Sequence, residues 1–190
     1  IMSTLHLLEY SRNLKNLRTF FYFSTDEVYG PALDEKLYKE DERHNPTNPY
    51  SASKSGAEQL CVAYNNTYKI PIIRINVMNA FGEKQHVEKF IPKVIKKVLN
   101  NGNIGESYNL TGEREVSNLE MAQIISKTMN KELNYKMVDF HSDRPGHDLR
   151  YGLDGSKMFD MGWELPINFE DSIKKTVLWT LKNQEWLDEL

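Results

Sequence analysis

Short apolar runs alternate with longer segments of helical periodicity along this chain, and this alternation constrains its fold most. Residues 19–24 and 71–76 are apolar runs too short for helices, and their aromatic and β-branched residues favour strands. Between them, residues 50–68 are bounded by Asn48-Pro49 and by Pro71, which are typical start and stop signals of a helix. This order of strand, helix and strand predicts an α/β protein.

Further elements are expected on both sides of this unit. Residues 30–49 lack periodicity and predict a long surface loop, of a kind that is often functional. Ser117, with Glu120 three residues later, predicts a capping box at the start of a helix. The periodicity predicts helices over 3–14, 88–100, 118–130, 155–161 and 169–183, and strands over 107–110 and 134–139.

The composition of the 190 residues excludes some classes of protein. A net charge of −3, with basic residues scattered along the chain, gives no sign of nucleic-acid binding. No apolar stretch approaches the roughly 18 residues that a membrane span needs, and no secretory signal is recognised. The histidines show no spacing typical of a metal site. The lone Cys61 agrees with a reducing compartment. We therefore expect a cytoplasmic protein that binds neither nucleic acid nor membranes.

Two adjacent carboxylates form the first part of a candidate site. Asp26 and Glu27 follow the apolar run 19–24, at the sheet edge where ligands bind in parallel α/β proteins. Two carboxylates with different surroundings can separate their pKa values and serve as acid and base. A solvated turn after a strand explains the same pair, and taken alone it is favoured by roughly two to one.

A tyrosine and a lysine form the second part. Tyr50 and Lys54 are four residues apart on the helix expected over 50–68, so they share one face of it. A nearby ammonium group favours phenolate, lowers the tyrosine pKa and allows Tyr50 to accept a proton from an alcohol. With ten tyrosines in the chain, about one such spacing is expected by chance. The pair Tyr50/Lys54 indicates a functional site only in combination with Asp26 and Glu27 and with the loop that separates the two pairs.

The combined pattern resembles a known family. Ser24-Thr-Asp-Glu-Val-Tyr-Gly30, followed by Pro46-Thr-Asn-Pro-Tyr-Ser-Ala-Ser-Lys-Ser-Gly-Ala-Glu58, is similar to the extended short-chain dehydrogenases/reductases. Within that family, the likeness is to the nucleoside-diphosphate-glucose 4,6-dehydratases, best known for dTDP-glucose. Segments 88–92, 105–110 and 143–151 agree with this assignment. Sugar epimerases of the family usually lack a carboxylate pair at this place.

The resemblance implies a reaction and roles for five residues. The reaction is dehydration of an NDP-glucose (dTDP- or UDP-glucose) to the NDP-4-keto-6-deoxyglucose, through transient oxidation at C4 by bound NAD. Tyr50 would take the proton of the 4-hydroxyl, Lys54 would hold Tyr50 as phenolate, and Thr25 would hydrogen-bond the 4-oxygen. Glu27 would remove the C5 proton, and Asp26 would protonate the departing 6-hydroxyl.

Binding residues and a partner follow from the same resemblance. NAD would be contacted by Ser24, Tyr50, Lys54 and Asn76. The nucleotide diphosphate of the substrate would be held by Asn79, Glu88, Lys89, Asn109, Arg144 and His147. Arg144 suits bidentate phosphate contact, although a salt-bridge cluster in a loop is an alternative for Arg144 and His147. A homodimer formed through helices that include the Tyr50 helix is implied, and the choice between dTDP and UDP stays open.

The implied fold is a Rossmann-like parallel sheet with its N-terminal half missing and a small C-terminal substrate-binding lobe. The family's Gly-x-x-Gly-x-x-Gly turn, which lets the backbone approach a pyrophosphate, does not occur, and the family's segment near Asn100–Asn103 is shortened. We expect residues 1–82 to form the C-terminal half of an NAD-binding domain with the catalytic residues. Residues 83–190 would form a sugar-nucleotide-binding lobe, interleaved with the sheet.

Such a sheet would expose an apolar edge, so we expect a fragment of a longer enzyme. The alternatives are a truncated, non-catalytic remnant that binds a sugar nucleotide or a protein partner, and a sugar-nucleotide epimerase or decarboxylase of the same family.

Overall fold

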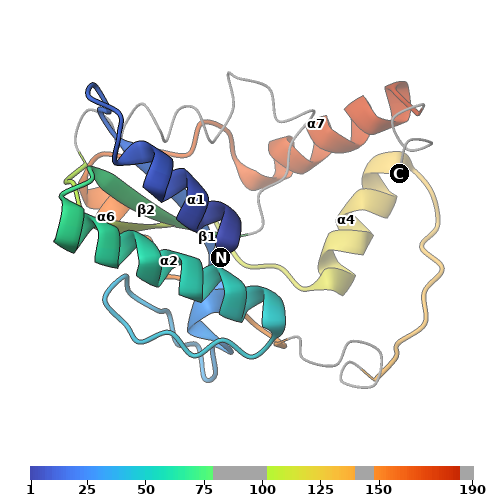
Figure 1. The fold of residues 1–190 in the computed structure, drawn as a ribbon. Helices are drawn as coiled ribbons and strands as arrows, with labels where there is room; N and C mark the ends of the chain where they lie inside the picture. Colours follow the sequence, from blue (N-terminus) through green and yellow to red (C-terminus); the bar gives the residue numbers. More distant parts are fainter. Residues whose placement is uncertain (79–101, 140–147, 185–190) are drawn as a thin grey trace. The chain divides into compact units, whose positions relative to one another are not determined.

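The computed structural model of the chain describes residues 1–78, 102–139 and 148–184 (Figure 1). Two compact units are distinguished. The first comprises Ile1–Met78 with the described parts of Lys96–Thr111 and Asp139–Trp163, and the second comprises Gly112–Val138 with the described part of Glu164–Leu190. The helix expected over 88–100 and the expected domain boundary at residue 82 lie outside the described residues.

A parallel sheet forms the centre of the first unit. The described residues contribute three strands to it, β1 (Phe20–Thr25), β2 (Ile72–Val77) and β3 (Ser107–Leu110), in the order β1-β2-β3. Phe20 pairs with Ile72, and Arg74 pairs with Ser107. The strands expected at 19–24, 71–76 and 107–110 are confirmed. Because the strands are parallel, Thr25, Val77 and Leu110 end at the same edge of the sheet, where ligands bind in such folds.

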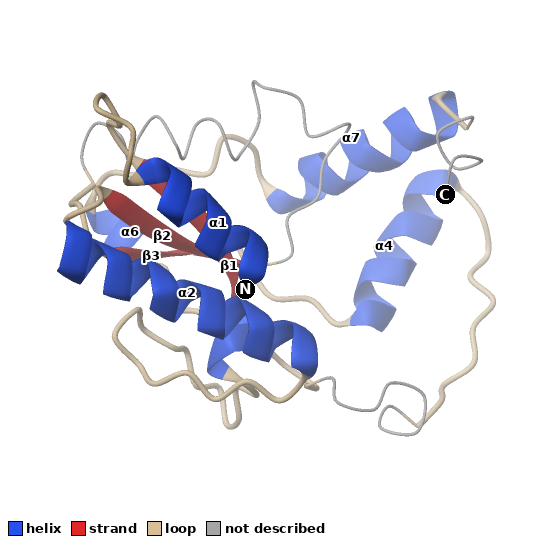
Figure 2. Ribbon diagram, viewed as in Figure 1, coloured by secondary structure: helices blue, strands red, loops and turns tan. Residues whose placement is uncertain are grey.

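Helices α1 (Met2–Ser11) and α2 (Pro49–Tyr68) cover one face of this sheet (Figure 2). Their core with the strands consists of Leu8, Tyr22, Ala57, Cys61, Tyr64, Ile70 and Ile72. The start of α2 is fixed by a reciprocal capping box, in which Ser51 N donates to Asn48 Oδ1 at 2.9 Å and Asn48 N donates to Ser51 Oγ at 3.3 Å. Pro49 occupies the first turn, where its missing N–H costs nothing.

The short helix α6 (Ser156–Asp160) packs against β3 on the other side of the sheet (Figure 2). Residues that precede it join the loop after β1, because Tyr38 N donates to Gly152 O at 3.0 Å and Asp154 N donates to Tyr38 O at 2.8 Å. The long loop expected over 30–49 is therefore held by backbone hydrogen bonds to a segment more than 100 residues later.

The second unit is a pair of helices, α4 (Asn118–Met129) and α7 (Phe169–Lys182). Their apolar faces meet in a cluster of Phe169, Ile173 and Val177 with Val116, Met121, Ile124, Ile125 and Met129. Glu120 N donates to Ser117 Oγ at 3.1 Å, which confirms Ser117 as the cap of α4. Asp171 N donates to Asn168 Oδ1 at 2.8 Å, and Asn168 caps α7 in the same way.

One expected strand is wrong. Residues 134–139 have no regular secondary structure, and the side chains of Tyr135, Met137 and Val138 are exposed. No strand of the described residues pairs with this segment. An apolar pattern becomes a strand only when a neighbouring strand and a buried face are available to it.

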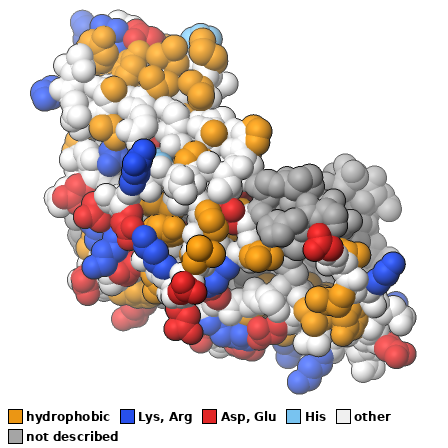
Figure 3. Space-filling view, turned by 90° about the horizontal axis from the view of Figure 1, so that it is seen from below, with side chains coloured by type: hydrophobic (Ala, Val, Ile, Leu, Met, Phe, Trp, Pro, Cys, Tyr) orange, Lys and Arg blue, Asp and Glu red, His pale blue; other side chains and the backbone are white. Residues whose placement is uncertain are grey.

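None of the described helices combines the length and the apolar character needed to cross a membrane. The part of the chain that the structure describes contains no group of His, Cys, Asp or Glu arranged to hold a metal ion. On the face drawn in Figure 3, acidic and basic side chains are intermingled rather than sorted into stripes of one sign.

Candidate active site

The carboxylate pair lies on a single tight turn at the end of β1. Residues Asp26–Tyr29 form a 3-10 helix, η1, and Glu27 N donates to Thr25 Oγ1 at 3.4 Å at its start. Gly30 ends the turn with φ at +80°, and a Cβ there would lie 2.3 Å from the backbone oxygen of Asn45. Only glycine fits this position, because both its conformation and the available space exclude a side chain.

Asp26 is buried, which argues against a solvated turn. Its Oδ1 accepts a hydrogen bond from Thr25 Oγ1 at 3.0 Å and another from Glu27 N at 3.1 Å. Burial raises the pKa of Asp26 to about 6, and the nearby charge of Glu27 acts in the same direction. Asp26 therefore stays protonated up to a pH much closer to neutral than an exposed aspartic acid does.

Glu27 has a different environment from its neighbour. Its side chain is half-buried, and Oε2 accepts a hydrogen bond from Asn48 Nδ2 at 2.9 Å. Asn48 also caps α2, so one side chain joins the carboxylate turn to the start of the helix that carries Tyr50. In the sequence Asn48 indicates only the start of a helix, but an asparagine amide can accept and donate at once, and this capacity is the signal for the second contact.

Lys54 lies against the end of β1. Its Nζ donates to Phe23 O at 2.5 Å and lies 4.9 Å from the ring centre of Tyr22. Burial lowers the pKa of the Lys54 ammonium, and the charge of Glu58 opposes that shift. Tyr50, one turn earlier, is more than half exposed, so its phenol is open to a substrate. The structure thus brings the turn at 25–27 and the Tyr50/Lys54 helix to one edge of the sheet.

Tyr151 is a further residue near the carboxylates. Its hydroxyl accepts a hydrogen bond from Asp148 N at 3.2 Å, and Thr47 Oγ1 donates to Asp148 Oδ2 at 2.8 Å. Burial raises the pKa of Tyr151, and the charges of Glu27 and Asp26 contribute to the shift. The sequence alone gives no reason to place Tyr151 at this site, because its distance in sequence from Glu27 hides their proximity.

The residues expected to contact NAD differ in accessibility. Ser24 Oγ is buried and has no hydrogen-bond partner among the described residues, which fits a contact to a bound cofactor. Asn76 is fully buried; its Nδ2 donates to Glu58 Oε2 at 3.3 Å and its Oδ1 accepts from Ser107 Oγ at 3.1 Å. In this structure the Asn76 side chain ties β2 to α2 and β3, and its contact with NAD stays a prediction.

Of the residues expected to hold the nucleotide diphosphate, the structure describes Asn109. It is fully buried, its Nδ2 donates to Tyr38 O at 2.8 Å and to Asp154 O at 3.2 Å, and its Oδ1 has no hydrogen-bond partner in the described residues. Asn109 thus connects the end of β3 to the loop that contains Tyr38 and to the segment that contains Asp154. The other residues of that set, Asn79, Glu88, Lys89, Arg144 and His147, lie outside the described residues.

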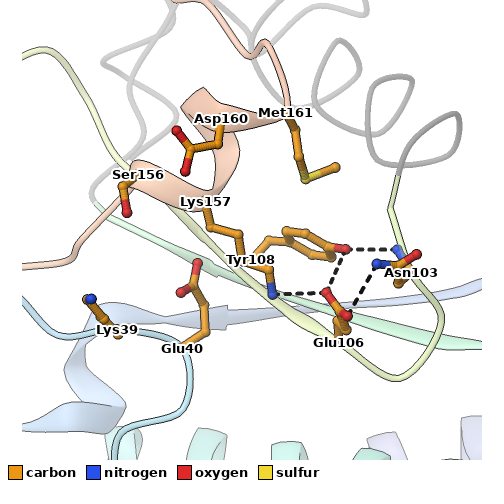
Figure 4. Close-up of a pocket in the computed structure, with 9 residues that line it drawn as sticks. All are labelled: Lys39, Glu40, Asn103, Glu106, Tyr108, Ser156, Lys157, Asp160 and Met161. Carbon is orange, nitrogen blue, oxygen red and sulfur yellow. Dashed lines mark hydrogen bonds and ion pairs between the residues drawn. The ribbon is translucent and has the colours of Figure 1, made fainter.

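A pocket of about 450 Å³ lies elsewhere, between α6, β3 and the loop after β1 (Figure 4). Lys157 Nζ donates to Ser107 O at 2.7 Å, forms an ion pair with Glu106 at 3.1 Å and lies over the ring of Tyr108 at 4.3 Å. None of the predicted catalytic residues lines this pocket. The lining residues are Lys39, Glu40, Asn103, Glu106, Tyr108, Ser156, Lys157, Asp160 and Met161. Of its charged lining residues, Lys157 and Glu106 are paired with each other, and the carboxylate pair Asp26/Glu27 lies at a different edge of the sheet.

Known proteins resemble the chain in sequence. The family model for GDP-mannose 4,6-dehydratase matches residues 1–111. A dTDP-glucose 4,6-dehydratase of Haemophilus influenzae is 34% identical over 233 residues, which cover 96% of this chain and 69% of the relative. The dTDP-glucose 4,6-dehydratase 1 of Escherichia coli is 32% identical, with 100% of this chain and 68% of the relative covered. The chain spans about two thirds of the length of these relatives.

Solved structures agree with this similarity. A dTDP-glucose 4,6-dehydratase from Bacillus anthracis in complex with NAD has a TM-score of 0.82 at 30% identity, covering 98% of this chain and 68% of that one. DesIV, a dTDP-glucose 4,6-dehydratase from Streptomyces venezuelae with NAD bound, has a TM-score of 0.85 at 29% identity, covering 98% and 66%. The α/β fold with a Rossmann-like parallel sheet is thereby confirmed. The chain belongs to the GDP-mannose 4,6-dehydratase family of extended short-chain dehydrogenases/reductases.

Proposed function

We propose that this chain carries the catalytic residues of an NAD-dependent 4,6-dehydratase that converts an NDP-glucose to the NDP-4-keto-6-deoxyglucose. The observation that carries the proposal is the pairing of a buried Asp26, whose pKa is raised to about 6, with a half-buried Glu27 beside the Tyr50/Lys54 helix. A dehydration across C5 and C6 needs an acid and a base at adjacent carbons, and the two environments separate these roles.

Oxidation at C4 requires a base for the 4-hydroxyl. Tyr50 takes this proton as phenolate, with the ammonium of Lys54 on the same helix face stabilising the negative charge. Lys54 is held by Phe23 O, so the charge stays at the end of β1. Thr25 hydrogen-bonds the 4-oxygen. NAD, held by Ser24, Tyr50, Lys54 and Asn76, would supply the acceptor for the C4 hydride and the donor of that hydride to C6.

Elimination uses the two carboxyl groups. The C4 ketone makes the C5 proton acidic, and Glu27 removes it, oriented by the hydrogen bond from Asn48. Asp26, protonated near its raised pKa, donates a proton to the departing 6-hydroxyl, so that water leaves. When the hydride returns to C6, Glu27 gives its proton back to C5, which completes the 4-keto-6-deoxy product. Glu27 N keeps the Asp26 carboxyl in position through the cycle, while the Thr25 hydroxyl, which donates to that carboxyl in the structure, turns to the 4-oxygen of the substrate.

Binding roles are assigned on the family pattern. Ser24, Tyr50, Lys54 and Asn76 hold NAD, and the unpartnered hydroxyl of Ser24 supports this set. The residues that hold the nucleotide diphosphate are Asn79, Glu88, Lys89, Asn109, Arg144 and His147. Residues 1–82 form the C-terminal half of the NAD-binding domain, and residues 83–190 form the sugar-nucleotide lobe, interleaved with the sheet. The nucleotide is dTDP or UDP: an Arabidopsis thaliana trifunctional UDP-glucose 4,6-dehydratase is also 34% identical over 219 residues.

The test is incubation of the chain with dTDP-glucose and UDP-glucose, with and without added NAD. We expect a keto-sugar that absorbs in alkali and has lost one water by mass spectrometry. Glu27→Gln should abolish it, whereas Glu132→Gln, at an exposed position of the second unit, should not. A product that keeps its 6-oxygen would indicate an epimerase or decarboxylase. No turnover, with sugar-nucleotide binding retained, would indicate a non-catalytic remnant.

We further propose a cytoplasmic homodimer that binds neither nucleic acid nor membranes. Support for the compartment comes from Cys61, which is buried and free. Support for the dimer comes from α1, which exposes Met2, Leu7 and Tyr10 beside the α2 helix that it packs against. A second copy of this chain, presenting the same two helices, would cover these side chains in a two-fold symmetric interface.

A further inference from the structure

A buried carboxylate lies on the same helix face as the proposed base. Glu58 is 3% exposed and follows Lys54 by four residues, as Lys54 follows Tyr50. The three side chains thus follow one face of α2 from its exposed start to its buried middle. A buried carboxylate is costly unless charges and hydrogen bonds compensate it. The proposed reaction assigns Glu58 no role, so its burial needs another explanation.

Strand β2 supplies two partners of this carboxylate. Asn76 Nδ2 donates to Glu58 Oε2 at 3.3 Å, and Arg74 Nε lies 3.6 Å from Oε1 as an ion pair rather than a hydrogen bond. Arg74 is itself anchored, because its NH1 donates to Gly105 O at 2.9 Å. Ser107 Oγ on β3 donates to Asn76 Oδ1 at 3.1 Å. The network therefore runs from α2 through β2 to β3.

The loop after η1 supplies a third partner. His44 Nε2 lies 3.8 Å from Glu58 Oε1, and its Nδ1 lies 2.9 Å from Ser55 Oγ on α2. Burial lowers the pKa of His44, and the charge of Glu58 opposes the shift. The His44 ring also meets the buried ring of Tyr29 edge-on, with centres 5.3 Å apart. The loop that carries Asn48 is therefore attached to the same point of α2.

We propose that Glu58 is a positioning residue for the dehydration proposed above: its carboxylate locks α2 against β2 and thereby holds Lys54 at the end of β1. The distance of 2.5 Å from Lys54 Nζ to Phe23 O marks the position that is held. Tyr22 Oη donates to Lys54 O at 3.1 Å and restrains the same turn from the β1 side. Sliding or turning α2 would break the contacts of Glu58 and of Lys54 together.

Glu58 also supplies the negative charge that faces Lys54. The other titratable groups that the structure places near Lys54 are Cys61 on α2 and Tyr22 on β1. Burial raises the pKa of Cys61 to about 12 and raises that of Tyr22, so both are neutral near pH 7. Without the charge of Glu58, burial would lower the pKa of Lys54 further.

The experiment measures Lys54 directly, without substrate or cofactor. The full chain is acetylated with limiting acetic anhydride between about pH 7 and about pH 11, and the labelling rate of each lysine is followed by peptide mass spectrometry. Glu58→Gln keeps the shape of the side chain but removes its charge. In this variant we expect the pH midpoint of Lys54 labelling to fall by at least about half a pH unit, which corresponds to roughly threefold faster labelling near neutral pH. The exposed Lys131 and the control Glu132→Gln should show no shift.

Two further measurements make the result decisive. Glu58→Asp keeps the charge but shortens the side chain, so we expect a Lys54 midpoint closer to the original and faster amide exchange over residues 50–58. A folded Glu58→Gln with an unchanged Lys54 midpoint overturns the proposal. So does a Glu58→Gln that fails to fold while Glu58→Asp matches the original chain in both measurements. Since labelling needs no sugar nucleotide, a failed dehydratase assay would leave this result standing, and the two proposals are tested separately.

Discussion

At the scale of single residues, adjacent carboxylates acquire different chemistry from their surroundings. Asp26 is buried and receives two hydrogen bonds on one oxygen, whereas Glu27 is half-buried and receives one from Asn48. The sequence places the two side by side but cannot tell which of them is buried. Burial decides, because removing water disfavours the charged form and raises the pKa of Asp26.

The raised pKa of Asp26 predicts a pH-dependent stability. The unfolded chain has an ordinary aspartate pKa of about 3.9, so between that value and about 6 the folded state binds more protons, and stability falls as pH rises. Asp26→Asn removes this loss and should stabilise the chain at pH 7 on the order of 2–3 kcal/mol, with little gain at pH 4. Denaturant unfolding at both pH values measures it. Asp41→Asn, at an exposed site, is the control, and an equal gain at both pH values would contradict the assignment.

The glycine that ends η1 gives a second prediction at this scale. Gly30→Ala places a Cβ 2.3 Å from Asn45 O at a φ of +80°, so it should cost at least about 2 kcal/mol and disturb the carboxylate turn. Gly112→Ala meets no atom within 4 Å and should change stability by less than about 0.5 kcal/mol. Thermal unfolding of both variants tests the difference, and similar melting temperatures would argue against it.

At the scale of elements, the end of strand β1 and the cap of helix α2 determine where the candidate site residues lie. The Asn-Pro signal predicts the start of α2 correctly, and the apolar runs predict β1, β2 and β3 to within about one residue. The strand expected at 134–139 fails, because an alternating pattern needs a partner strand that local sequence does not specify. Residues 88–100 lie outside the described residues, so the helix expected there stays a prediction.

Asn48 caps α2 and donates to Glu27, so it connects the stability of this helix with the proposed catalysis. Asn48→Ala removes the cap of α2 and the donor to Glu27, so it should cost about 1 kcal/mol of unfolding free energy and also reduce turnover. Asn168→Ala removes an equivalent cap from α7, which carries none of the proposed catalytic residues. We expect a similar loss of stability in both variants, measured by denaturant unfolding, but lower kcat in Asn48→Ala alone. Equal effects on kcat would mean that the Asn48–Glu27 contact has no part in the reaction.

At the scale of the whole molecule, the proposed dimer rests on the apolar side chains that α1 leaves exposed. Leu8 is fully buried against α2, while the neighbouring Leu7 and Tyr10 are more than half exposed. Isolated exposed apolar residues are common, but on one helix beside α2 they suit a symmetric interface. The homodimer is a proposal, and the surface of α1 is the part of the chain on which it depends.

The oligomeric state tests that surface. Leu7→Glu combined with Tyr10→Glu should convert a dimer to a monomer in light scattering, because two buried carboxylates in each subunit oppose association. Lys131→Gln and Lys174→Gln, on exposed positions of the second unit, form the control pair with the same change of net charge. A dimer that survives the α1 double variant would move the interface elsewhere.

What the sequence determined by itself was the local information: strand and helix type, the caps Asn48 and Ser117, and the presence of Thr25, Asp26, Glu27, Tyr50 and Lys54 in a recognisable order. These properties depend on near neighbours in the chain, so a linear pattern can carry them. Only the tertiary structure decided which groups are buried and which distant residues they meet. It buried Asp26, joined Glu27 to Asn48, placed Glu58 between His44 and Arg74, and brought Tyr151 near the carboxylates. Desolvation and contacts between distant segments exist only after the chain has packed, and they set the pKa values on which the chemistry depends.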